Sequence, residues 1–355
     1  MSLVIKQHIS LASLTTINLG GPAAYFAECT TVDEVCEALA FADNRQLKIH
    51  ILGGGSNTIF LDEGFPGLIL KMGIRNVHTE QNGDVVLFTA GGGVVWDDCV
   101  LDAVNQGASG IECLSGIPGT VGASPIQNIG AYGQEVKDTI ESVSVVDRQT
   151  LRPVDFSGAE CRFTYRQSRF KSADRGRYVI TEVRYRLRKN TSPEIKYPEL
   201  RKFLDVQMDV QRPDDQTSIL QSIRKAVLTL RYSKSMVFDT SDENARSVGS
   251  FFMNPVLSPE KFETLKARIA ELGKVMPNVF PSTEGVKVPA AWLIEQSGFR
   301  KGYTKNGAAI SSRHALALVN KGCKTIDILN LAAEIQAGVF SVFSVELERE
   351  GIVID

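Results

Sequence analysis

Residues 111–133 read IECLSGIPGTVGASPIQNIGAYG, a stretch with neither the helical nor the strand spacing of apolar residues. Loops in compact domains usually have about 4–6 residues, so an irregular stretch of roughly 23 residues is typical of a functional segment. Its glycines let the backbone approach a flat or anionic ligand closely, and its serine, glutamine and asparagine side chains offer uncharged hydrogen bonds. A packed surface loop without a ligand is the alternative interpretation.

Two triple glycines, at 53–55 and 91–93, each follow an apolar run that predicts a strand. Glycine uncovers backbone amides and tolerates a positive φ, so such a turn can hold phosphate oxygens. Neither turn has the GxGxxG spacing of a dinucleotide fingerprint or the Lys-Ser/Thr pair of a P-loop. Each is therefore either a phosphate cradle or an ordinary tight turn, and the short polar side chains of Ser56 and Asn57 favour a cradle at the first.

The apolar spacing elsewhere alternates between strands and helices, which predicts α/β or α+β layers. Strands are predicted at 24–29, 48–52, 67–72, 84–90, 140–147, 161–165, 177–187 and 342–347. Helices are predicted at 31–44, 96–106, 259–272, 290–297 and 325–340, and helical spacing also covers 198–230. Thr31 is the expected N-cap of the first helix, and the polar segment 232–246 is the expected boundary before a last unit.

The composition excludes several classes of protein. The 355 residues are 43% apolar and 23% charged with a net charge of −2, which excludes intrinsic disorder and a broad face for nucleic acid. The six cysteines form no CxxC pair and the four histidines are scattered, so free thiols and no metal are expected. We see no secretory leader and no run of about 20 apolar residues, so we expect a soluble cytoplasmic protein that binds no membrane.

Three further segments place charged or nucleophilic side chains where loops or strand ends are expected: FTYRQSRF (163–170), GSFFMNP (249–255) and ELERE (346–350). Ser250 is either a turn or capping serine or a proton carrier, because no histidine stands in a motif that would make it a nucleophile. The carboxylates of 346–350 either face solvent at alternate positions of a strand or take part in chemistry.

Seven motifs, in order over almost the whole chain, resemble the UDP-N-acetylenolpyruvoylglucosamine reductase family. They are TTINLGGPA (15–23), LGGGSN (52–57), GIPGTVGASPIQNIGAYG (116–133), YRQS (165–168), GSFFMNP (249–255), AAWLIEQ (290–296) and LERE (347–350). KYPEL (196–200) resembles the tyrosine-bearing loop of the longer subclass of this family, which folds over bound substrate. The chain departs from the family pattern at Gly351 and Ile352, where Val-Arg is usual, and at Met253, where some members have lysine.

The resemblance implies an α+β fold with a PCMH-type FAD-binding region of two α+β subdomains and a C-terminal α+β substrate-binding domain. The implied boundaries are 1–74 for the first subdomain, with about 346–355 returning to it, 75–235 for the second, and 236–345 for the substrate-binding domain. No histidine lies in either glycine-rich segment, so we expect FAD to bind non-covalently. A monomer is expected.

The resemblance also implies roles for individual residues. The expected catalytic residues are Arg166, Ser250 and Glu350. The expected FAD-binding residues are Gly53, Gly54, Gly55, Ser56, Asn57, Ser115, Gly116, Ile117, Pro118, Gly119, Gly122, Ala123, Ser124, Gln127, Asn128, Gly130 and Ala131. The expected substrate-binding residues are Tyr132, Tyr197, Lys234, Asn254 and Lys287, and no metal ligand is expected.

The implied reaction reduces UDP-N-acetylglucosamine enolpyruvate to UDP-N-acetylmuramate, a peptidoglycan precursor. NADPH gives a hydride to FAD, and flavin N5 passes it to the enolpyruvyl group. Arg166 and a protonated Glu350 would stabilise the enolate, and Ser250 would supply the proton. Lysine suits the UDP diphosphate as a point charge. Another flavin oxidase of the same superfamily, or a nucleotide-binding module without catalysis, are the alternatives.

Overall fold

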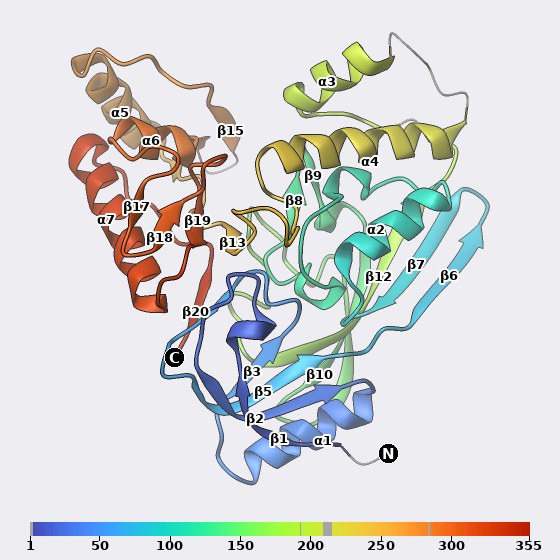
Figure 1. Ribbon diagram of the computed structural model, residues 1–355. Helices are drawn as coiled ribbons and strands as arrows, with labels where there is room; N and C mark the ends of the chain where they lie inside the picture. Colours follow the sequence, from blue (N-terminus) through green and yellow to red (C-terminus); the bar gives the residue numbers. More distant parts are fainter. Residues whose placement is uncertain (1–2, 192, 209–214, 283–284) are drawn as a thin grey trace. The chain divides into compact units, whose positions relative to one another are not determined.

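Figure 1 shows the helices and strands of the computed structural model, which describes residues 3–191, 193–208, 215–282 and 285–355. The described chain divides into two compact units. Unit 1 comprises Met1–Ile9, Ala23–Gly54 and Pro66–Val237, and unit 2 comprises Ser10–Pro22, Gly55–Phe65 and Phe238–Asp355. The predicted boundaries near 74, 235 and 345 stay a prediction, because this division does not resolve subdomains within a unit.

The first sheet of unit 1 has the strand order β1-β2-β5-β3 and packs against helix α1. The bounds are Lys6–Ser10 (β1), Pro22–Cys29 (β2), Ile49–Leu52 (β3), Phe65–Met72 (β5) and Val32–Asp43 (α1). The helix begins where expected, because the Thr31 side chain accepts a hydrogen bond from the Glu34 amide at 3.1 Å. β3 runs parallel to β5, and Leu52 of β3 pairs with Lys71 of β5. Lys71 therefore lies beside the end of β3, the strand that leads into the first triple glycine.

The second sheet of unit 1 is antiparallel, with the order β11-β10-β12-β7-β6. The bounds are Val77–Asn82 (β6), Val85–Gly91 (β7), Ile140–Asp147 (β10), Arg152–Ser157 (β11) and Tyr178–Arg188 (β12), with helices Trp96–Asn105 (α2), Pro198–Met208 (α3) and Gln216–Ser233 (α4). The strand predicted at 161–165 is wrong: these residues form turns, with Arg162 at a φ of 50°, and β11 pairs with β10 instead. The helical spacing at 198–230 belongs to two helices, and residues 209–214 between them lie outside the described residues.

The glycine-rich stretch 111–133 contains only short elements. They are the 3₁₀ turns Glu112–Leu114 (η2) and Val121–Ala123 (η3) and the two-residue strand Gly130–Ala131 (β8), which pairs with Gln134–Glu135 (β9) before a last 3₁₀ turn, Val136–Asp138 (η4). Leu114 and Val121 are buried in the core of the second sheet. The predicted irregular segment is thus anchored at intervals by buried apolar side chains.

The described residues of unit 2 share a hydrophobic core, to which three small sheets and three helices contribute. One sheet has the order β13-β19-β18-β17 (Ser247–Ser250, Ala317–Asn320, Ala308–Ile310, Thr304–Lys305) and a second has the order β14-β16-β15 (Val256–Leu257, Gly285–Lys287, Phe280–Ser282). The helices are Pro259–Glu271 (α5), Ala290–Gln296 (α6) and Thr325–Phe343 (α7), and a 3₁₀ turn at Ala12–Leu14 (η1) belongs to the N-terminal segment of this unit.

The end of the chain differs from the prediction of a strand at 342–347. Helix α7 continues to Phe343, because Val339 and Phe343 are buried in the core of unit 2, and the last strand is Ile352–Ile354 (β20). β20 pairs in parallel with Thr58–Phe60 (β4). Among the described helices, α7 alone is long and apolar enough to cross a membrane. Its Ile328, Leu331, Ile335 and Val339 side chains are buried in this core, whereas Ile326 and Phe340 are about half exposed.

Candidate active site

The two glycine-rich segments of unit 1 touch each other. A Cβ added at Gly54 would lie 2.7 Å from the Gly119 Cα, and one added at Gly53 would lie 2.6 Å from the Thr120 Oγ1. At Gly54 a side chain would collide with the backbone of Gly119, and at Gly53 it would require the Thr120 side chain to move. The first triple glycine is therefore held against the long loop, as a site formed by both segments requires.

The amides of the two triple glycines are used differently. In the second, Gly91, Gly92 and Gly93 donate to the carbonyls of residues 76, 181 and 74 at 2.7–2.8 Å, which leaves no amide for a phosphate. In the first, the amides of Gly54 and Gly55 make no hydrogen bond within the described part of the chain. Of the two alternatives drawn from the sequence, the tight turn is correct for 91–93, and the uncommitted amides at 54 and 55 favour a cradle there.

Several polar side chains predicted to bind the cofactor are committed to the loop itself. The buried Ser115 hydroxyl donates to the Glu112 carbonyl at 2.6 Å, and the buried Ser124 hydroxyl bonds the Tyr185 hydroxyl at 2.9 Å. Asn128 donates to the Thr164 carbonyl at 2.9 Å. Ile117, Pro118, Gly119, Gly122, Ala123, Gln127, Gly130 and Ala131 lie along the same backbone, from η2 to β8. These hydrogen bonds fix the loop, and its backbone is what the loop can offer a ligand.

Helix α4 ends beside the start of this loop and brings an arginine there that the sequence analysis missed. The Nε of Arg231 is buried and makes no hydrogen bond within the described residues, and it would lie 3.4 Å from a Cβ at Gly116. The Arg231 Nη2 donates to the Met236 carbonyl. Burial lowers the pKa of Arg231 to about 10, so the side chain is a cation at neutral pH.

A second arginine of α4 is paired. Arg224 binds both carboxylate oxygens of Asp97, at 2.6 and 2.7 Å, and the Gly116 amide donates to the same carboxylate at 2.6 Å. Burial alone would raise the pKa of Asp97, but these donors together hold it below its usual range. Asp97 thus takes its hydrogen bonds from Arg224 and the Gly116 amide, and it acts on Arg231 through its charge.

Three of the five predicted substrate-binding residues lie together in unit 1. Tyr132 and Tyr197 pack edge to face, with ring centroids 5.3 Å apart, and burial raises the pKa of Tyr132 to about 12. Lys234 follows α4 and is ion-paired with Glu199, at 2.7 Å. The predicted catalytic Arg166 belongs to the same unit, where its Nη2 donates to the Gly130 carbonyl at 3.0 Å. Its φ of 53° is unusual for arginine and is typical of a residue held by its surroundings.

The other two predicted catalytic residues lie side by side in unit 2. Ser250 ends β13, and the Glu350 amide donates to the carbonyl of the next residue, Phe251, at 2.8 Å. The Asn57 side chain also reaches this segment, because it donates to the Glu350 carbonyl at 3.1 Å. Asn254 accepts the Ala290 amide at 2.9 Å at the start of α6, and Lys287 lies on β16. The hydrogen bond between Glu350 and Phe251 joins two segments that are more than ninety residues apart in the sequence. The spacing of residues in the sequence alone does not predict this contact.

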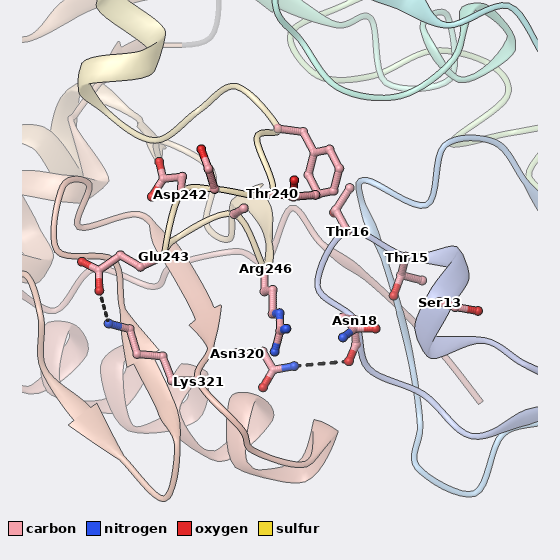
Figure 2. A pocket seen from close by; sticks show the side chains of 13 residues that line it. Ser13, Thr15, Thr16, Asn18, Thr240, Asp242, Glu243, Arg246, Asn320 and Lys321 are labelled. Carbon is pink, nitrogen blue, oxygen red and sulfur yellow. Dashed lines mark hydrogen bonds and ion pairs between the residues drawn. The ribbon is translucent and has the colours of Figure 1, made fainter.

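A pocket of about 640 Å³ in unit 2 contains none of the predicted site residues (Figure 2). Its wall is closed by an ion pair between Lys321 and Glu243 at 3.3 Å and by a hydrogen bond from the Asn320 side chain to the Asn18 carbonyl at 3.2 Å. Arg246 extends between these two contacts. This pocket therefore does not identify the candidate site.

Two family models match this chain. The family described as FAD binding domain matches residues 23–150, and the family described as UDP-N-acetylenolpyruvoylglucosamine reductase, C-terminal domain, matches residues 241–354. The chain is 44% identical to the UDP-N-acetylenolpyruvoylglucosamine reductase of Thermobifida fusca, covering 100% of this chain and 99% of that protein. It is 39% identical to the enzyme of that name from Mycolicibacterium smegmatis, covering 99% and 95%.

A solved structure shares the fold. The crystal structure of UDP-N-acetylenolpyruvylglucosamine reductase from Thermus caldophilus matches over 100% of both chains, with a TM-score of 0.68 at 23% identity. Fold and domain matches together define the class: an FAD-binding oxidoreductase with an α+β FAD-binding region and an α+β C-terminal domain, as the sequence predicted. Within that class, the chain belongs to the UDP-N-acetylenolpyruvoylglucosamine reductase family.

The residues present fit FAD. Its diphosphate needs hydrogen-bond donors and positive charge, and unit 1 has the uncommitted amide of Gly54, the buried Thr120 hydroxyl without a hydrogen bond within the described residues, and the half-buried Arg231 cation. The close contact of Gly54 with Gly119 brings the two segments of unit 1 into one cradle. Gly54 and Thr120 lie on the two glycine-rich segments that the sequence assigned to FAD, whereas Arg231 lies on α4, outside them.

Proposed function

We propose that this protein reduces UDP-N-acetylglucosamine enolpyruvate to UDP-N-acetylmuramate with NADPH, as a step in peptidoglycan precursor synthesis. The observation that carries the proposal is the full-length relative of this name at 44% identity. FAD, when bound, supplies hydride transfer from NADPH to the enolpyruvyl group. The chain must supply the charge that stabilises an enolate and the proton that completes the reduction.

Arg166, Ser250 and Glu350 are the residues proposed for this chemistry. A guanidinium can hold a carboxylate through two parallel hydrogen bonds, and the bond from Arg166 Nη2 to the Gly130 carbonyl supports its placement beside the cofactor loop. The backbone pairing of Glu350 with Phe251 supports a joint role for Glu350 and Ser250. In this role Glu350 helps Arg166 to stabilise the developing charge, and the Ser250 hydroxyl gives its proton to the carbon that bears the ether oxygen.

Five residues are proposed to bind the UDP-sugar. The exposed part of Lys234 and the adjacent Tyr132–Tyr197 pair support a diphosphate-binding role in unit 1. In unit 2, the Asn254 Oδ1 is committed to α6, and its Nδ2, which makes no hydrogen bond within the described residues, suits an acceptor on the sugar or the diphosphate. Lys287 is half-buried and is proposed as a further cation for the diphosphate.

The remaining proposals concern the setting of the enzyme. We propose a cytoplasmic monomer with three domains (1–74 with 346–355, 75–235 and 236–345) that acts on a small molecule and binds neither nucleic acid nor membrane. The net charge of −2 and the packing of the apolar face of α7 in the core of unit 2 support the last two points. Free cysteines throughout the described chain suit a reducing compartment.

The experiment is NADPH oxidation by the purified protein, with and without UDP-N-acetylglucosamine enolpyruvate, together with detection of UDP-N-acetylmuramate. We expect oxidation that depends on the enolpyruvyl substrate and one product molecule for each NADPH. Oxidation that ignores the substrate but consumes oxygen would indicate a different flavin oxidase. A flavin-containing protein that oxidises no NADPH under either condition would contradict the proposal altogether.

A further inference from the structure

Lys71 is a half-buried lysine whose side chain is bonded to the first triple glycine. Its Nζ donates a hydrogen bond to the Gly53 carbonyl. Burial lowers the pKa of Lys71, partly offset by the nearby Glu28 carboxylate. Lysine is rarely buried without a strong reason, because desolvating an ammonium is costly. We therefore asked what the hydrogen bond from Lys71 to the Gly53 carbonyl, just after the end of β3, does for the protein.

The peptide group that follows Gly53 provides the answer. The carbonyl of Gly53 and the amide of Gly54 belong to the same planar trans peptide, so they point in opposite directions. When Lys71 holds the carbonyl, the Gly54 amide is turned to the other side. That amide makes no hydrogen bond within the described residues. A positive charge on the carbonyl also polarises the peptide and makes its N–H a stronger donor.

The surroundings of Gly53 and Gly54 show where this peptide is held. Gly54 touches Gly119, and Gly53 lies against the buried Thr120 hydroxyl, so neither residue can shift without moving the long loop. The parallel pairing of Leu52 with Lys71 anchors the lysine one residue from the turn. Strand β5 and the loop thus fix this peptide from both sides.

We propose that Lys71 is a positioning residue for the cofactor, which orients the Gly54 amide toward the FAD diphosphate and adds positive charge to the cradle. The proposal rests on the FAD-dependent part of the proposed function and not on the identity of the substrate. Lys71 itself need not touch the cofactor. Lys71 acts through the peptide group between Gly53 and Gly54. Its effect on binding is therefore confined to ligands that contain the diphosphate.

The test compares FAD release from full-length holoenzyme variants on dilution, followed by flavin fluorescence, and titrates the flavin-free full-length chain with ADP and with riboflavin. Lys71→Met removes the donor and the charge, and we expect about 10- to 100-fold weaker binding of FAD and ADP, the effect of a hydrogen bond to a charged group. Riboflavin, which lacks the diphosphate, should bind as to the wild type. Lys71→Arg keeps charge and donor and should stay within about threefold of the wild type.

Lys48→Met is the matched control, since Lys48 is an exposed lysine beside the start of β3 with no side-chain contact described, and FAD binding should not change. Unchanged FAD affinity in Lys71→Met would overturn the proposal, and so would an equal loss of FAD and riboflavin. If Lys71→Met fails to fold, Lys71→Gln replaces it with the same expectation in weaker form. A wild type that binds FAD but does not reduce the enolpyruvyl substrate would defeat the proposed reaction and leave this inference to be decided by the FAD titrations.

Discussion

Arg231 shows what a single side chain can reveal about a site. A buried donor without a partner costs about 1–3 kcal/mol, so the structure tolerates the Arg231 Nε and the Thr120 Oγ1 only at the expense of stability. Both lie beside the glycine-rich segments, where hydrogen bonds to a bound diphosphate can offset that loss of stability. The sequence contained a signal for Arg231, because Ile223, Val227 and Arg231 fall on one face of α4, and a cation on an apolar face is unusual.

A first prediction concerns the proposed proton donor. In Ser250→Ala, reduction of FAD by NADPH should continue, because that half-reaction needs no proton at the substrate carbon. Reoxidation by the enolpyruvyl substrate should slow by at least about 10²-fold, the low end for general acid catalysis. Stopped-flow measurement of both half-reactions is the test. Equal slowing of the two would assign Ser250 to structure or flavin binding, the alternative that the sequence left open.

A second prediction concerns the pH dependence of stability. Burial lowers the pKa of His50 to about 4, compared with about 6.5 in the unfolded chain. As the pH falls, the unfolded state therefore takes up the proton first. The contribution of the neutral, buried His50 to the free energy of unfolding is fully present above about pH 6.5. It is lost as the pH falls toward about 4, up to about 3 kcal/mol in total. Urea unfolding of His50→Gln should show a shallower loss of stability over this window than the wild type. The exposed His78 is the control, and a His78→Gln variant with the same flattening would refute the assignment to His50.

At the scale of elements, the sequence predicts features that depend on neighbouring residues, such as the start of a helix. It does not predict features that depend on distant residues, such as the pairing of strands. Thr31 and its periodic apolar residues fix the start of α1, so that helix was correctly predicted. The strand expected at 342–347 is wrong because burial of Val339 and Phe343 extends α7, which overrides the β-branched pattern. The true last strand, β20, pairs with β4, almost 300 residues earlier in the chain, and no local signal shows that partner.

A third prediction follows from the pairing of α3 with α4. Leu200 and Leu204 of α3 are buried against α4, and this packing holds Glu199 on the proposed diphosphate residue Lys234, at 2.7 Å. The carboxylate competes with a diphosphate for the same ammonium. Exposed pairs of this kind are worth about 0–1 kcal/mol, so Glu199→Gln should bind UDP up to about fivefold more tightly, while binding of uridine stays unchanged.

The control for this prediction is Glu194→Gln, which removes the carboxylate of an exposed ion pair with Lys196 on the same segment. It should leave UDP binding unchanged. Isothermal titration of the wild type and of both variants, as holoenzymes, with UDP and with uridine gives the six affinities required. Weaker UDP binding by Glu199→Gln would mean that Glu199 holds Lys234 in place for the ligand and does not compete with it.

At the scale of the whole molecule, sequence order and spatial order differ. Residues 10–22 and 55–65 belong to the compact unit that contains the C-terminal third of the chain, although their neighbours in sequence belong to the other unit. The motifs at 52–57 and 347–350 were both recognised from the sequence, but the hydrogen bond from the Asn57 side chain to the Glu350 carbonyl was not. Motifs therefore predict which residues matter, and the long-range pairing of the backbone decides which of them meet.

The last prediction concerns how the whole protein holds its cofactor. The residues that fit FAD are backbone amides, a hydroxyl and a guanidinium, and none of these forms a covalent bond to a flavin. None of the four histidines lies in the two glycine-rich segments. The purified protein should therefore be yellow, and acid precipitation should release intact FAD into the supernatant. Because FAD binds the folded state, FAD in excess at about 100 times its Kd should stabilise the flavin-free chain by about 2.7 kcal/mol in urea unfolding. Flavin that remains with the precipitate would show a covalent link, and unfolding that is indifferent to added FAD would show that the cradle does not bind it.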